Sequence, residues 1–123
     1  MFKIDEITFD MTTRQGDSFN FDTNIVDDDS SWNYYYSVYN IATQEILFQT
    51  LARIENNKAF FNVTPAESNL MTVPEGKKFA VYGYGFKRCK DGFEDTLNVG
   101  DKKISDINKI TVYPLITEGD ENG

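Results

Sequence analysis

The chain has 123 residues, which is enough for one domain with one hydrophobic core. Aromatic residues make up 15% of it, and the formal net charge is −8. This composition excludes a disordered polypeptide, which is poor in aromatic residues. The negative charge argues against binding to nucleic acid or to anionic lipid, because both select basic surfaces.

The charge is unevenly distributed along the chain. Residues 1–45 contain nine acidic and two basic residues, whereas residues 77–110 contain eight basic and five acidic residues. One interpretation is that solvated faces differ by chance. The other is that one pole of a subunit meets the opposite pole of a neighbour, and such contacts close into rings or stack into tubes.

The first residues carry charges at once, at Lys3, Asp5 and Glu6, and form no apolar signal-peptide core. No stretch of 18 apolar residues follows, so we expect neither a signal peptide nor a transmembrane helix. Cys89 is the single cysteine of a chain without histidine. It therefore forms no intrachain disulfide and lacks the usual base of a cysteine nucleophile.

Alternation of apolar and polar residues, typical of half-buried strands, begins at the N-terminus. A phase slip at Asp5-Glu6 predicts a bulge or kink before a second short strand that contains Ile7, Phe9 and Met11. Residues 19–25 alternate with one wet face and predict the next strand.

Two apolar stretches follow, at residues 34–41 and 46–54. We expect strands buried on both faces, joined by a hairpin at residues 42–45. The Asn56-Asn57 pair predicts a turn into a strand over residues 58–63, with Ala59, Phe61 and Val63 on one face.

The last third of the chain is again strand-like. Residues 79–87 predict the longest strand. Gly83 and Gly85 lie on the same side of it and leave part of that side without side chains, which suits a bulge or the close approach of another backbone. A turn at residues 90–92 leads to a strand over residues 93–99, and residues 103–116 supply one or two more.

Turn signals every 8–12 residues and the absence of helical periodicity predict the fold class. We expect an all-β protein, an Ig-like antiparallel β-sandwich of about eight strands. Residues 1–116 form this single domain, and residues 117–123 form a flexible polar C-terminal tail.

The order of several short motifs resembles a β-sandwich of tailed-phage virions, the N-terminal domain of phage baseplate upper proteins. The motifs lie between residues 12 and 116 and mark turns and core positions. They read Arg14-Gln15-Gly16-Asp17-Ser18-Phe19-Asn20-Phe21, Pro65-Ala66-Glu67-Ser68-Asn69-Leu70, Gly76-Lys77-Lys78-Phe79-Ala80-Val81, Lys90-Asp91-Gly92-Phe93-Glu94-Asp95-Thr96-Leu97 and Val112-Tyr113-Pro114-Leu115-Ile116. Gln15 is inserted relative to the family pattern, and Glu67-Ser68 stands where Asp-Thr is usual.

The resemblance implies a non-enzymatic structural protein of a phage virion. Such a subunit makes repetitive contacts with other virion proteins in a tail, baseplate, neck or capsid surface, as a homo-oligomer or within a hetero-assembly. It would be assembled in the host bacterial cytoplasm and need no cofactor.

Acidic clusters are the candidates for metal binding. Asp27, Asp28 and Asp29 with the two following serines offer oxygen ligands for Ca²⁺, but the run lacks the spacing of an EF-hand loop. Whether it binds a divalent cation or is a solvated loop stays open. In the second acidic region, alternation places Asp95 and Glu94 on opposite sides of a strand, which divides the cluster.

Residues for catalysis are missing. Without histidine, Ser-His-Asp and Cys-His chemistry are excluded, and no glycine-rich phosphate loop precedes a helix. We therefore expect no enzyme activity.

Aromatic and charged residues are the candidates for contact instead. Trp and Tyr are enriched at protein interfaces, but they also stack on sugars in carbohydrate-binding modules, which is the alternative function. The predicted contact residues are Asp27, Asp28, Asp29, Trp32, Tyr34, Tyr36, Tyr39, Lys87, Arg88 and Lys90.

Overall fold

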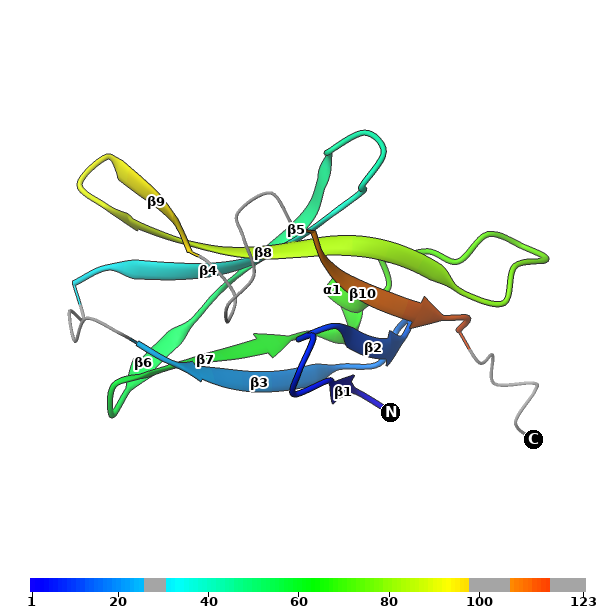
Figure 1. The fold of residues 1–123 in the computed structure, drawn as a ribbon, viewed down its shortest axis with the longest axis horizontal. Coiled ribbons are helices and arrows are strands. Elements are labelled where there is room, and N and C mark those ends of the chain that lie inside the picture. Colours follow the sequence, from blue (N-terminus) through cyan, green and yellow to red (C-terminus); the bar gives the residue numbers. More distant parts are fainter. Residues whose placement is uncertain (26–30, 98–106, 116–123) are drawn as a thin grey trace.

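The computed structural model describes residues 1–25, 31–97 and 107–115. Their strands form two packed layers (Figure 1). The prediction of an all-β sandwich is therefore confirmed. The elements are β1 (Lys3–Ile4), β2 (Met11–Arg14), β3 (Phe19–Asn24), β4 (Asn33–Tyr39), β5 (Ile46–Leu51), β6 (Arg53–Glu55), β7 (Lys58–Val63), α1 (Pro65–Ser68), β8 (Ala80–Lys90), β9 (Phe93–Leu97) and β10 (Asn108–Tyr113).

The two sheets differ greatly in width. The large sheet has the order β1-β2-β10-β8-β4-β5, with β9 also paired to β8, and the small sheet has the order β3-β7-β6. Every pair is antiparallel except β2 with β10, where Met11 lies beside Ile110. The described residues thus contain ten strands, more than the eight expected, and one parallel pair.

The additional strands arise where a predicted strand is interrupted or continues in the other sheet. The predicted strand at residues 46–54 divides at Ala52, whose N–H donates to the Tyr34 carbonyl at 2.8 Å. Before this residue the chain pairs in the large sheet as β5, and after it in the small sheet as β6. The expectation that this stretch is buried on both faces is wrong, because β5 and β6 each turn only one side toward the opposite sheet.

One edge of β8 is shared by two strands in succession. Phe86 pairs with Leu97 of β9, whereas Tyr84, two residues earlier, pairs with Asn108 of β10. Residues far apart in sequence thus continue one line of pairing along β8.

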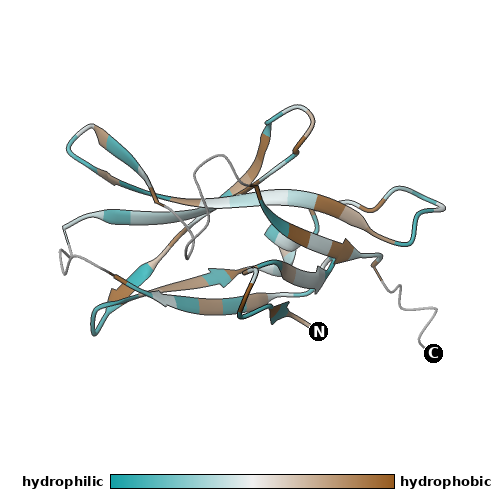
Figure 2. Ribbon diagram, viewed as in Figure 1, coloured by the Kyte–Doolittle hydropathy of each residue, from teal (hydrophilic) through white to brown (hydrophobic). Residues whose placement is uncertain are grey.

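Hydrophobic and hydrophilic residues alternate along β3 (Figure 2). In each strand, this kind of alternation decides which side chains enter the core. In β7, Ala59, Phe61 and Val63 are buried as predicted. In β4, however, only every second residue is buried, so residues 34–41 are not covered on both faces. Rings from both sheets meet in the centre: the Tyr36 centroid lies 6.0 Å from that of Phe61 and 5.5 Å from that of Phe86.

The N-terminal segment differs from the prediction. Ile7 is 88% exposed and belongs to a turn between β1 and β2, not to a strand. The Asp5 carboxylate accepts hydrogen bonds from the N–H groups of Ile7 and Thr8, at 2.8 and 2.9 Å, which lowers its pKa. This local side-chain-to-backbone bonding competes with strand formation.

The connection from the small to the large sheet contains one turn of helix, which alternation did not predict. Thr64 caps α1 in a capping box: its hydroxyl accepts from the Glu67 N–H at 3.1 Å, and the Glu67 carboxylate accepts from the Thr64 N–H at 3.0 Å.

The two glycines of β8 have different surroundings. A Cβ on Gly83 would lie 2.4 Å from Cζ of Tyr39, whose ring covers this position, whereas a Cβ on Gly85 meets nothing within 4 Å among the described residues. The predicted close approach at Gly83 is therefore made by a side chain and not by another backbone.

This contrast predicts opposite effects of two equal substitutions. Gly85→Ala should raise the free energy of unfolding by about 0.5 kcal/mol, because glycine weakens a strand interior. Gly83→Ala should lower it by about 1 kcal/mol, because the Tyr39 ring must move. Urea denaturation followed by Trp32 fluorescence measures both values.

The Tyr39→Ala background serves as the control. There the Gly83→Ala penalty should disappear, since no ring covers the glycine. Equal stabilisation by both alanines in the wild-type background would contradict the packing described above.

Candidate functional site

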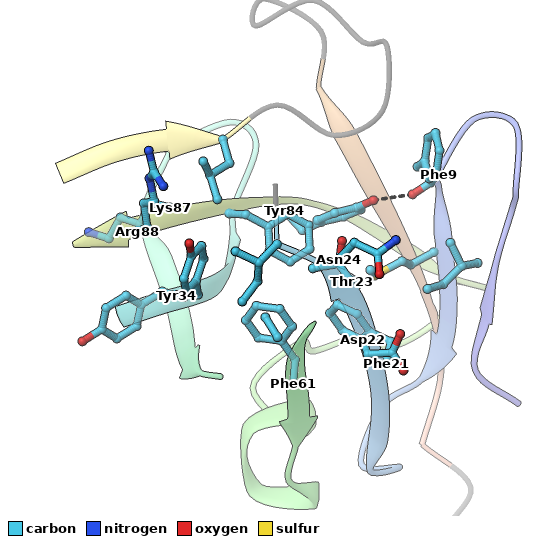
Figure 3. Close-up of a pocket in the computed structure, with 17 residues that line it drawn as sticks. Phe9, Phe21, Asp22, Thr23, Asn24, Tyr34, Phe61, Tyr84, Lys87 and Arg88 are labelled. Carbon is cyan, nitrogen blue, oxygen red and sulfur yellow. Dashed lines mark hydrogen bonds between the residues drawn. The ribbon is translucent and has the colours of Figure 1, made fainter. Parts of the chain in front are cut away.

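A cleft opens where the small sheet ends at β3. Its volume is about 490 Å³, and it lies between β3, the turn before β2 and the paired strands β8 and β9 (Figure 3). The cleft exists because the inner face of the large sheet is wider than the three strands that cover it. Its apolar lining includes Phe9, Phe21, Phe61, Tyr84, Phe86 and Leu97.

Tyr84 links the cleft to the N-terminal turn. Its hydroxyl donates a hydrogen bond to the carbonyl of Phe9, which has a φ of 63°. Burial raises the pKa of Tyr84, and the nearby charge of Asp10 raises it further. The phenol therefore stays protonated at neutral pH and holds a strained backbone residue in place.

Two charge pairs join β8 to β9 beside the cleft, whose lining includes Lys87 and Arg88. Arg88 Nε donates to Asp95 Oδ2 at 3.0 Å, and Lys87 Nζ donates to Glu94 Oε1 at 2.8 Å. The contact with Glu94 raises the pKa of Lys87, and the same bond lowers the pKa of Glu94. These pairs are partly exposed, so each adds little stability.

The structure brings together four of the predicted contact residues: Trp32, Tyr34, Arg88 and Lys90. The Arg88 guanidinium lies 4.3 Å from the centre of the Trp32 ring, and Lys90 Nζ lies 5.8 Å from it. Tyr34 is beside them: its hydroxyl raises the pKa of Arg88, ahead of the contribution from Asp95. We call Trp32, Arg88 and Lys90 the Trp32 cluster.

Two predicted contact residues are core residues instead. Tyr36 is fully buried and Tyr34 is 5% exposed, because alternation turns both toward the small sheet. The Tyr36 hydroxyl donates to the Met11 sulfur at 3.2 Å. The prediction that they contact partner proteins is wrong.

The remaining predicted residues are scattered. Tyr39 lies on the outer face of the large sheet over Gly83, and Lys87 pairs in register with Tyr35 on that same face. Asp27, Asp28 and Asp29 lie outside the described residues.

Sequence reasoning missed the surface along β5. This strand is the outermost strand of the large sheet on one side. Ile46 is 52% exposed and Leu51 is 55% exposed. The signal was present as six residues without charge, glycine or proline, but it was interpreted as a strand buried on both faces.

The described residues offer no set of groups for metal chemistry. No cluster of three or more His, Cys, Asp or Glu side chains suited to a metal occurs among them. In the same part of the chain, no helix is long and apolar enough to cross a membrane.

Comparison with known proteins found no protein-family model, no curated protein and no solved structure that matches this chain.

The buried phenols predict how stability depends on high pH. Burial also raises the pKa of Tyr36 well above its ordinary value. The folded protein therefore keeps protons that the unfolded chain releases above about pH 10, so stability falls as pH rises beyond that value. We expect urea denaturation between neutral pH and pH about 11 to show this loss.

The Tyr84→Phe variant separates the two tyrosines. It should lose about 1 kcal/mol of stability at neutral pH with the hydrogen bond to Phe9. Above about pH 10, its free energy of unfolding should fall less steeply with pH than that of the wild type. The two slopes should differ by about 1.4 kcal/mol per pH unit, the value for one proton. An unchanged slope would contradict the raised pKa of Tyr84.

Proposed function

We propose that this chain is a non-enzymatic structural protein of a phage virion, a β-sandwich subunit that contacts other proteins repeatedly. The observation that carries the proposal is apolar surface on the outside of the large sheet. Four side chains are between 39% and 55% exposed: Ile46 and Leu51 of β5, Val81 of β8, and Phe79, which directly precedes β8. Contiguous apolar patches mark interaction surfaces, and we propose that these side chains contribute to one.

The shape of this face supports contact with a flat partner. The Tyr39 ring lies over Gly83, and the position above Gly85 is open among the described residues. Phe79 packs against Tyr113 with ring centroids 6.2 Å apart. Rigid aromatic rings lose little conformational entropy on binding, which suits them to interfaces.

The assignment to a virion rests on the resemblance in sequence. Three of the motifs contain glycines with positive φ, 87° at Gly16 and 85° at both Gly76 and Gly92, where other residues are strained. Such turns determine how the strands of a sandwich are connected and do not determine what it binds. The assignment of partner proteins therefore rests on the resemblance and not on the fold.

The alternative, a carbohydrate-binding module, depends on Trp32. Sugar stacking needs an open ring face, and the Arg88 guanidinium stacks on this ring at 4.3 Å. A sugar would have to displace a cation that also bonds Asp95. This arrangement favours the structural protein over the module.

Purified phage particles test the leading proposal. Quantitative mass spectrometry of particles of the phage that encodes the chain should find it at a fixed copy number relative to the capsid protein. The control is a non-virion protein of the same phage, measured in the same particles. Particles that lack the chain would overturn the proposal.

Glycan binding tests the alternative. We expect no sugar on a glycan array to bind the purified chain in a way that Trp32→Ala abolishes. Phe93→Ala is the matched control, because Phe93 is an aromatic residue that pairs with Lys90 in the neighbouring β8–β9 hairpin and is 71% exposed. Binding that is lost with Trp32→Ala and kept with Phe93→Ala would establish the module instead.

A further inference from the structure

The inner face of β3 is only partly covered by the large sheet. Thr23 follows Phe21 by two residues, so both side chains point toward the large sheet. The Phe21 ring packs against Tyr36 with centroids 4.9 Å apart, whereas Thr23 is exposed. Thr23 and Ile25 line the cleft instead. The cleft is therefore a space between the two sheets that the side chains of the described residues leave unfilled.

The size and the lining of the cleft suit one small aromatic molecule. Its volume of about 490 Å³ lies within the roughly 300–1,000 Å³ of small-molecule sites. Rings that contact one another form its wall: the centroids of Phe21 and Phe61 are 5.2 Å apart, and those of Tyr84 and Phe86 are 5.8 Å apart. Aromatic rings pack favourably against a further ring, either offset or edge to face.

One polar group that lines the cleft lacks a partner. Tyr34 is 5% exposed, and its hydroxyl forms no hydrogen bond with any described residue (Figure 3). Its cross-strand neighbour Arg88 carries hydrogen-bond donors only, so Arg88 cannot accept the phenolic proton. The phenol of Tyr84, by contrast, already donates to Phe9. A buried donor without an acceptor is unfavourable, and a bound molecule with an acceptor oxygen removes that penalty.

The charged side chains of the cleft lining already have partners. Lys87 and Arg88 each bond a carboxylate of β9, and Asp22 Oδ1 lies 3.9 Å from Lys58 Nζ. A charged ligand would have to compete with these pairs. The lining therefore favours an uncharged ligand that is held by packing and by one hydrogen bond.

We propose that this cleft binds a small uncharged aromatic molecule, with its ring among the aromatic side chains and an acceptor oxygen on the Tyr34 hydroxyl. Aromatic ketones, esters and ethers have this chemistry. The site lies between the sheets and not on the outer face of the large sheet. Its occupancy therefore does not depend on the proposed role in a virion, and the two proposals can fail separately.

Titration of the purified chain with 2-acetylnaphthalene, an aromatic ketone, tests the proposal. In methyl NMR spectra, the signals of Met11, Ile25 and Leu97, which line the cleft, should shift through the ring current of the bound ligand. We expect a dissociation constant on the order of 0.1 mM. The signals of Ile46 and Leu51 on β5 are the control and should stay in place. Shifts on β5 alone, or no shift up to about 1 mM ligand, would overturn the proposal.

The Tyr34→Phe variant tests the hydrogen bond. It should be as stable as the wild type, because the hydroxyl has no partner among the described residues, and should bind 2-acetylnaphthalene about threefold to tenfold more weakly. Tyr82→Phe is the matched control, since Tyr82 is buried outside the cleft lining and donates to the Thr72 carbonyl. This control should lose stability and keep its affinity. Wild-type affinity in Tyr34→Phe would overturn the assigned acceptor contact.

A substitution that fills the cleft gives a test without any change in the core. Thr23→Phe places a ring in the cleft from an exposed position, so the methyl shifts should disappear while the circular dichroism spectrum is kept. Asn20→Phe is the matched control, because Asn20 is exposed on the opposite face of β3 and does not line the cleft. It should bind like the wild type. Unchanged binding by Thr23→Phe would overturn the cleft as the site.

A charged probe tests the preference for an uncharged ligand. 2-Naphthoate carries a carboxylate on the same ring system and should bind more weakly than 2-acetylnaphthalene, because the cations of the lining are already paired. Equal or tighter binding of 2-naphthoate would overturn this part of the proposal.

Discussion

Contact between aromatic rings of the two sheets is the interaction on which the fold depends. Tyr36 of β4 and Phe61 of β7 are almost completely buried and pack against Phe21 and Phe86. Each ring removes more apolar area from water than an aliphatic side chain does, so a few positions hold the layers together. The strands that carry these rings are therefore held in place, whereas the strands outside them can end, bend or change sheet.

The unequal width of the sheets produces the surfaces with functional interest. Three strands cannot cover seven, so an aromatic cleft remains beside β3, and the outer face and edge of β5 stay in solvent. The curvature of the large sheet closes part of this gap, since Phe2 stacks on Phe19 with centroids 4.4 Å apart. Exposed apolar surface of this kind is typical of sites that contact other proteins.

Several local features were predictable because they need only neighbouring residues. Asn56 and Asn57 have φ values of 50° and 62°, the left-handed turn that their side chains tolerate. The buried face of β7 followed from alternation.

Tyr34 and Tyr36 were mistaken for contact residues because alternation does not reveal which face of a strand the second sheet covers. Trp32 and Arg88 were each singled out, but their stacking requires β4 to pair with β8.

The sequence by itself determined that this protein is an all-β sandwich, where most of its strands and turns lie, and that histidine chemistry is absent. These properties depend on side-chain volume and backbone preference over a few residues. The tertiary structure alone decided that residues 46–55 change sheets at Ala52, that the Tyr39 ring covers Gly83, and that β5 is an edge. A strand in isolation has two equivalent edges, and only the order of strands across the sheet determines which of them remains unpaired.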